Sequence, residues 1–322
     1  MILLNLREFR SILGLVGILI LAIAFSPAAA DGSRIFLQPG NLTDILRQIS
    51  VIGIIALAMT YVILTAGIDL SVGSILALST SVTAMTLTRA SSSSYSQHII
   101  VAILAALAIS TAAGALNGAV IALLDIQPFV VTLASMIGIR GLAKWLTGNA
   151  NIDIGFGRDV AAAFAAIVRQ KIVVIGSYLA LAVMFWIVLS RTVFGRHVRA
   201  IGDNELAGRY TGLPIRSIKI WVYSLSGLLS GFAGVLYAAE NHQGNPNAGV
   251  AYELDAIAAV VIGGTRLAGG KGSIPGTIVG ALTIGVLTNM LRLNNVDSNV
   301  EMMIKAVIIV LAVAVQKGRN TE

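Results

Sequence analysis

The sequence has one long basic polar interruption, Arg191-Thr-Val-Phe-Gly-Arg-His-Val-Arg-Ala-Ile-Gly-Asp-Asn-Glu-Leu-Ala-Gly-Arg-Tyr-Thr-Gly-Leu-Pro-Ile-Arg216. Most of the chain on either side of it is apolar enough to lie in a lipid bilayer. Over 322 residues, 57% are hydrophobic and 11% are charged, with a mean hydropathy of +0.88, whereas about 25% of the residues of soluble domains are charged. The composition indicates an all-α integral membrane protein, in which the basic stretch is placed to reach a soluble partner.

Apolar runs of about 20 residues, the length that crosses the hydrocarbon core as a helix, predict about ten transmembrane helices. The run from Ile45 to Leu87 would be roughly 65 Å long as a single helix, so it must fold back, and we place the break at Ala66-Gly-Ile-Asp-Leu-Ser-Val-Gly-Ser74. We expect one transmembrane domain over residues 1–322, in two related halves of about five helices. The predicted spans are 11–30, 45–66, 71–88, 99–124, 129–147, 172–190, 218–239, 254–267, 274–291 and 300–315.

The end of the first span, Ser26-Pro-Ala-Ala-Ala-Asp31, also fits a signal-peptide cleavage site, because small residues follow an apolar core. Whether this helix is retained stays open. Between the fifth and sixth spans we predict a short amphipathic helix at 160–168.

The positive charges predict an orientation. Lys and Arg gather in the cytoplasmic loops of membrane proteins, and they are densest in the basic stretch. If the N-terminus is cytoplasmic, the even-numbered spans end inside the cell, which places 191–217 and the C-terminal tail there as well. We therefore expect both termini to be cytoplasmic, and the net charge of +7 gives no reason to expect a nucleic-acid partner.

Several kinds of chemistry are excluded or unsupported by the sequence. The chain has no cysteine, so it has no disulfide, thiolate metal site or thiol nucleophile, and its three histidines lack ligand-like spacing. The segment Gly263-Gly-Thr-Arg-Leu-Ala-Gly-Gly-Lys-Gly-Ser273 fails the phosphate-loop pattern, because Gly272 separates Lys271 from Ser273. We expect no enzyme activity, no metal and no cofactor in this chain.

Asp69 is the most informative ionisable residue, because a carboxylate near the bilayer centre normally faces a cavity or a partner. It either caps the helix that follows it or lines a solute pathway. Transporters tend to place their sites at short spans that are interrupted by glycine. The end of the eighth span, at Gly263 and Gly264, is therefore a second candidate position for a pathway. The candidate pathway residues are Asp69, Ser71, Asn117, Thr132, Gly263, Gly264 and Asn289.

Small residues also recur every four positions, which brings helix backbones close together. Such repeats occur at 114 and 118, at 227 and 231, and at 272, 276 and 280. We interpret them as helix-packing seams. Within the basic stretch, Gly202, Asp203 or Asn204 can start a short helix through Tyr210 that ends before Gly212.

Three stretches of the sequence resemble the permease subunits of ribose-type ATP-binding cassette importers, which carry pentoses, hexoses and related solutes. They are Ile63-Leu-Thr-Ala-Gly-Ile-Asp-Leu-Ser-Val-Gly-Ser74, Phe194-Gly-Arg-His-Val-Arg-Ala-Ile-Gly-Asp-Asn204, and Tyr252-Glu-Leu-Asp-Ala-Ile-Ala-Ala-Val-Val-Ile-Gly-Gly-Thr265 with Gly269-Gly-Lys-Gly-Ser273. The resemblance covers essentially the whole chain from the second span onward. Ala66 departs by one methyl group from the commoner Gly-Gly-Ile-Asp-Leu-Ser pattern.

The resemblance implies a permease subunit in a bacterial inner membrane. Its partners would be a second permease copy or paralogue, a pair of cytoplasmic subunits that hold ATP and magnesium, a periplasmic solute-binding protein and a sugar. Residues 191–217 would form a cytoplasmic coupling loop, in which the ATPase contacts are Arg196, Arg199, Ala200, Gly202, Asp203, Asn204, Glu205, Ala207 and Gly212. The alternative is an ion-coupled secondary transporter with Asp69 as its ion site, since such a carrier would share this composition and topology.

Overall fold

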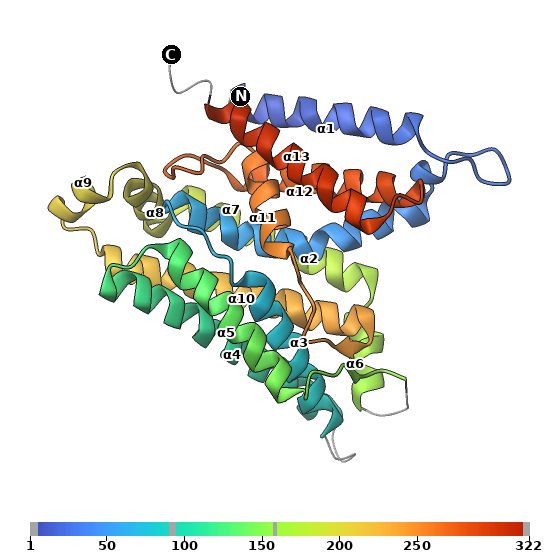
Figure 1. Ribbon diagram of the computed structural model, residues 1–322, viewed down its shortest axis with the longest axis horizontal. Coiled ribbons are helices and arrows are strands. Elements are labelled where there is room, and N and C mark those ends of the chain that lie inside the picture. Colours follow the sequence, from blue (N-terminus) through green and yellow to red (C-terminus); the bar gives the residue numbers. More distant parts are fainter. Residues whose placement is uncertain (1–5, 90–94, 157–159, 318–322) are drawn as a thin grey trace.

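The computed structural model describes residues 6–89, 95–156 and 160–317, most of which are helical (Figure 1). Two strands, β1 (Ile152–Asp153) and β2 (Gln243–Gly244), pair in antiparallel fashion. In chain order the helices are α1 (Leu6–Ala24), η1 (Ile35–Leu37), α2 (Pro39–Leu64), α3 (Val72–Thr88), α4 (Tyr95–Leu124), α5 (Pro128–Leu146), α6 (Val160–Val168), α7 (Lys171–Arg191), α8 (Val193–Asp203), α9 (Glu205–Tyr210), α10 (Ile215–Asn241), α11 (Tyr252–Ile262), α12 (Ile274–Leu293) and α13 (Ser298–Lys317).

Each predicted span contains a helix, and α6 is the predicted helix at 160–168. Among the described residues, six helices are long and apolar enough to cross a membrane by length and composition: α2, α4, α5, α7, α10 and α12. These helices make the chain an all-α, multi-pass membrane protein. The count of about ten spans and the two related halves stay predictions.

Two predicted spans are too long at their C-terminal ends. The first was expected to reach Ala30 but α1 ends at Ala24, shortly before Pro27, which has no backbone N–H to continue a helix. The eighth was expected to reach Leu267 but α11 ends at Ile262. Gly264 follows in a left-handed conformation, with φ +89°, which ends a helix.

The second half of α2 is the centre of the fold. Every residue from Gly53 to Leu64 is buried, and α7, α10, α11 and α12 pack around the helix. Tyr61 donates a hydrogen bond to the backbone oxygen of Phe185 on α7 at 2.6 Å, and the two rings meet edge to face. By contrast, α4, α5 and α7 have mostly exposed surfaces, which suits helices that face lipid.

Glycines bring helices into backbone contact, as the four-residue repeats predict. A Cβ on Gly114 of α4 would lie 2.2 Å from the backbone oxygen of Tyr223 on α10, where Gly227 faces it. A Cβ on Gly280 of α12 would lie 1.9 Å from the backbone oxygen of Ala259 on α11. Only glycine permits these approaches, so the packing seams are confirmed at the interfaces of α4 with α10 and of α11 with α12.

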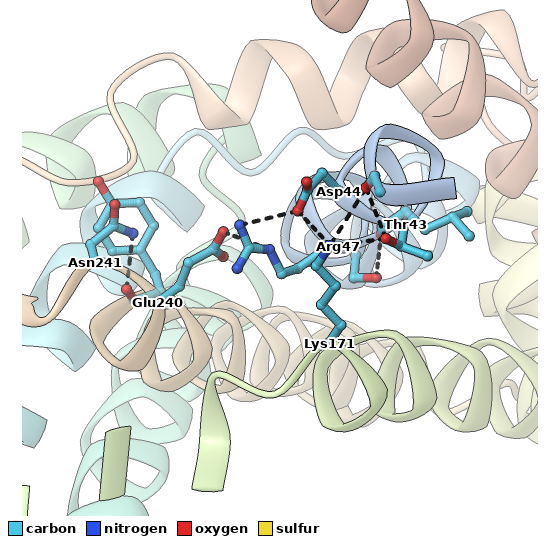
Figure 2. A network of polar contacts seen from close by, with 10 residues as sticks. Thr43, Asp44, Arg47, Lys171, Glu240 and Asn241 are labelled. Atoms are coloured by element: carbon cyan, nitrogen blue, oxygen red, sulfur yellow. Dashed lines mark hydrogen bonds and ion pairs between the residues drawn. The ribbon is translucent and has the colours of Figure 1, made fainter. Parts of the chain in front are cut away.

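At the end of the molecule opposite α8 and α9, ion pairs join three helices (Figure 2). The Arg47 guanidinium of α2 lies 3.6 Å from the Asp44 carboxylate and 3.3 Å from the Glu240 carboxylate of α10. Lys171, which begins α7, lies 3.0 Å from Asp44 and donates a hydrogen bond to Thr43 at 2.9 Å. These contacts hold together the adjacent ends of α2, α7 and α10.

We expect Arg47→Gln to lower the free energy of unfolding by about 1 kcal/mol, because it removes the positive member of two ion pairs. Lys171→Gln should cost less, since Lys171 and Asp44 are each 41% exposed and their pair is screened by water. Thermal unfolding of the purified protein in detergent measures both effects. A larger loss in Lys171→Gln than in Arg47→Gln would contradict this ranking.

Candidate functional site

The break between α2 and α3 holds a closed cluster of polar side chains around Asp69, which is fully buried. One carboxylate oxygen of Asp69 accepts hydrogen bonds from the Ser71 backbone N–H at 2.9 Å and from the Ser71 hydroxyl at 2.6 Å. The other oxygen accepts from the Ser226 hydroxyl of α10 at 2.7 Å. Asn117 of α4 donates to the Ser71 hydroxyl at 2.9 Å. The cluster therefore joins α4 and α10 through the break.

Thr132 of α5 closes the same region from another side. Its buried hydroxyl lies 3.0 Å from the backbone oxygen of Ile68, next to Asp69, and 2.9 Å from that of Pro128 in its own helix. The structure thus brings together Asp69, Ser71, Asn117 and Thr132, as a common site requires.

The expected capping role of Asp69 differs in detail from the structure. Ser71 is the N-cap residue of α3, and its side chain bonds none of the helix N–H groups. Asp69 instead accepts the N–H of Ser71 itself, which shapes the turn before the helix. Sequence reasoning missed Ser226, because a single serine in a span carries no signal without knowledge of what it faces. A role of the cluster in a solute pathway stays a prediction.

The other pathway candidates lie elsewhere. A Cβ on Gly263 would lie 2.3 Å from the backbone oxygen of Gly276, so Gly263 serves the contact between α11 and α12, and Gly264 terminates α11. Asn289 of α12 and Asn41 of α2 exchange hydrogen bonds through their amides, at 2.8 and 3.2 Å. These residues hold neighbouring helices together and do not contribute to the Asp69 cluster.

The basic stretch folds into two helices, where only one was expected. Thr192 caps α8 by accepting the Gly195 N–H at 3.3 Å, and the helix runs through Asp203. Its buried face carries Gly195, Val198 and Ile201. The apolar residues recur every three positions among cations, which is typical of an amphipathic helix at the surface. The prediction of a single short helix in this stretch therefore missed α8. Of the coupling candidates on α8, Arg196, Ala200 and Asp203 are exposed, while Arg199 and Gly202 are half-buried.

Gly202 lies against the backbone of two other segments. A Cβ at this position would lie 1.7 Å from the backbone oxygen of Leu64, at the end of α2, and 2.5 Å from the nitrogen of Gly270. Gly270 in turn donates its N–H to the Leu64 oxygen at 3.0 Å. The end of α8 is therefore seated on the end of α2 and on the connection between α11 and α12.

α9 begins and ends as predicted from the sequence. Asn204 caps it by accepting the Ala207 N–H at 2.9 Å, and Gly212 follows it with φ +78°. Leu206 and Tyr210 lie one turn apart and are 66% and 91% exposed. Two large apolar side chains left in water on a short projecting helix are typical of a contact surface, and α9 projects from one end of the molecule (Figure 1).

Glu205, the first residue of α9, is held by two cations. Its carboxylate oxygens lie 2.8 Å from the ammonium of Lys219 on α10 and 2.8 Å from the guanidinium of Arg209. Partial burial raises the pKa of the Glu205 carboxyl, but the hydrogen bonds from both cations outweigh burial and hold its pKa below the ordinary value. Glu205 therefore stays ionised at neutral pH.

Comparison with known protein families identifies the family to which this chain belongs. Residues 41–313 match the model of the family described as branched-chain amino acid transport system / permease component. The chain is a member of this permease family. The matched residues run from the start of α2 into α13, so both the Asp69 cluster and the two helices of the basic stretch lie inside the family match.

Individual relatives of this permease match along nearly their whole length. The ribose import permease of Escherichia coli K12 is 41% identical over 98% of this chain and 95% of its own. The ribose import permease of Bacillus subtilis 168 is 38% identical over 98% and 94%, and the D-allose transport system permease of E. coli K12 is 33% identical over 92% and 90%. No solved structure matches the chain.

Proposed function

We propose that this chain is the permease subunit of an ATP-driven sugar importer in a bacterial inner membrane. The observation that carries the proposal is the match to ribose and allose permeases along nearly the full length of both partners. The surface formed by α8 and the projecting helix α9 supports it, because an importer driven by a separate ATPase needs a surface for that subunit.

The proposal includes partners and an orientation. Two cytoplasmic subunits would hold ATP and magnesium, a second permease copy or paralogue would complete the path, and a periplasmic binding protein would deliver the sugar. With α8 and α9 on the cytoplasmic side, the ion-pair network around Arg47 lies on the periplasmic side, since α10 runs from one end to the other. About ten spans in two related halves would then enclose the path, with both termini in the cytoplasm.

The contribution of this chain would be mechanical. Movement of the ATPase would displace α8 and α9, and the contact of Gly202 with Leu64 and Gly270 would pass that displacement to α2 and to the connection before α12. The Asp69 cluster lies directly beyond Leu64 and joins α4, α5 and α10. A shift at the end of α2 therefore reaches the buried polar groups, which is how a packed interface converts a local movement into a change of access.

The exposed pair on α9 gives a direct test of docking. We expect the double variant Leu206→Ala/Tyr210→Ala to reduce co-purification of the ATPase at least about tenfold, because exposed apolar side chains that become buried dominate the energy of an interface. Phe156→Ala is the matched control, since Phe156 is 78% exposed but packs against His242, just after the other end of α10. Equal retention of the ATPase by all three proteins would exclude α9 as the docking element.

The ion-coupled alternative predicts a different energy source. Proteoliposomes that contain the permease, its ATPase and its binding protein can be supplied with labelled ribose, allose, arabinose or fructose. We expect at least one of these sugars to be transported only when ATP is present on the side of the membrane where the ATPase lies. Uptake that persists without ATP and collapses when the proton gradient is removed would contradict the importer function.

A further inference from the structure

α9 is linked to the membrane helices across an open hollow. The hollow has a volume of about 350 Å³ and is lined by the end of α4, by α9 and by the residues from Leu213 to Lys219. The buried residue of α9 is Gly208, which has no side chain to pack. The side chains of Leu213 and Ile215 reach Gly208, but α9 itself inserts no apolar side chain among the spans. Polar contacts therefore add to its connection with them.

Two ion pairs join α9 to neighbouring segments, and they differ in how far their side chains are exposed to solvent. The side chain of Lys219 is 12% exposed and lies 2.8 Å from Glu205, whose side chain is 31% exposed. The pair of Arg209 with Asp125, at the end of α4, has a separation of 3.3 Å and side chains that are 51% and 74% exposed. Exposed pairs contribute little to stability, while loss of one member of a sheltered pair is costly. The contact of Glu205 with Lys219 is thus the firmer link.

Lys219 occupies a position from which a movement can reach the Asp69 cluster. It lies two turns before Ser226 on α10, about 10 Å along the helix axis, and Ser226 donates its hydroxyl to Asp69. One continuous chain of contacts runs from Glu205 to Lys219, along α10 to Ser226, and from Ser226 to Asp69. A contiguous network of this kind can carry coupling between two distant sites.

We propose that Glu205 is the positioning residue that transmits the displacement of α9 to α10, through its ion pair with Lys219. The inference rests on the proposed function, in which α9 contacts an ATPase. Glu205 acts through Lys219 and touches no solute. Its replacement should therefore separate ATP hydrolysis from transport, whereas loss of the docking surface would remove the ATPase altogether.

The experiment uses the assembled importer in proteoliposomes and measures ATP hydrolysis and the uptake of labelled ribose, or of the first sugar in the panel above that the wild type accumulates. Glu205→Gln and Lys219→Met should each reduce uptake about tenfold at nearly unchanged hydrolysis, since each removes one member of the sheltered pair. The double variant should be no worse than either single variant, because the two residues act as a unit. Asp125→Asn is the matched control and should remain within about twofold of wild type, because its ion pair is exposed.

The outcomes separate this inference from the function on which it rests. Uptake losses in the double variant that multiply those of the singles, or a loss in Asp125→Asn as large as in Glu205→Gln, would overturn the role of Glu205. Normal uptake in Glu205→Gln would do the same while leaving ATP-driven import intact. Co-purification of the ATPase with each variant completes the test: loss of the ATPase from Glu205→Gln would show a docking residue, not a transmitting one.

Discussion

Gly202→Ala should abolish ATP-driven uptake almost completely, by more than about a hundredfold, because the added methyl group has no space. A Cβ at this position would lie 1.7 Å from the Leu64 backbone oxygen and 2.5 Å from the Gly270 nitrogen. Both are backbone atoms, so no side chain can rotate away to relieve the clash. The end of α8 must lift off the end of α2, and the hydrogen bond from Gly270 to Leu64 must distort or break.

The measurement is uptake in proteoliposomes, together with the elution profile of the purified chain on a sizing column. Gly176→Ala is the matched control, because a Cβ at this helical position in α7 would meet nothing within 4 Å. If Gly202→Ala is poorly folded, limited proteolysis should show cleavage confined first to residues 191–217, where the displacement occurs. A folded Gly202→Ala protein with normal uptake would refute the tight seating of α8 on α2.

Asp69→Asn should reduce uptake at least about tenfold, since charged hydrogen-bond acceptors contribute about 1.5–3 kcal/mol each. The carboxylate accepts three hydrogen bonds without access to water. An amide has one acceptor oxygen and must turn its NH2 group toward a donor. Either the Ser71 or the Ser226 contact is then lost or reversed, and the link between the break and α10 weakens.

Asp125→Asn is the natural comparison for this variant as well, because it makes the same chemical change at an exposed aspartate. Uptake by the two variants, measured with equal amounts of purified protein, should differ by about tenfold in favour of Asp125→Asn. Ser226→Ala adds a second check, since it removes one donor and leaves the carboxylate in place, and it should lie between the two. Equal uptake by Asp69→Asn and Asp125→Asn would remove Asp69 from the transport mechanism.

Local features of the fold follow directly from the sequence. The short helix from Glu205 to Tyr210 could be predicted because it is bounded by its own signals, the Asn204 cap and Gly212. The helix at 160–168 could be predicted from its own short apolar run. The packing seams could be predicted because glycine spacing is set within one helix. α8 was missed because its cations conceal an apolar repeat formed by Gly195, Val198 and Ile201.

Contacts between distant segments could not be predicted in this way. The partner of Asp69 on α10 is 157 residues away, and no property of Ser226 identifies it as that partner. The same holds for the pairing of Asn289 with Asn41, which separates this candidate from the Asp69 cluster. From residue type alone, Asp69 and Asn289 were both assigned to one pathway. In the structure they lie in two separate places, the Asp69 cluster and the contact of α12 with α2.

The distance in sequence between Asp69 and Ser226 has a consequence for how the protein is made. A ribosome adds about 5–20 residues per second, so Ser226 is synthesised roughly 8–30 s after Asp69. During this interval the apolar second half of α2 is stable in lipid, whereas placing the carboxyl group of Asp69 there without a hydrogen-bond partner costs free energy. Ser71, two residues further along the chain, supplies both a backbone and a side-chain donor. Ser71 can therefore satisfy part of the hydrogen-bonding capacity of Asp69 before α10 is inserted and Ser226 becomes available.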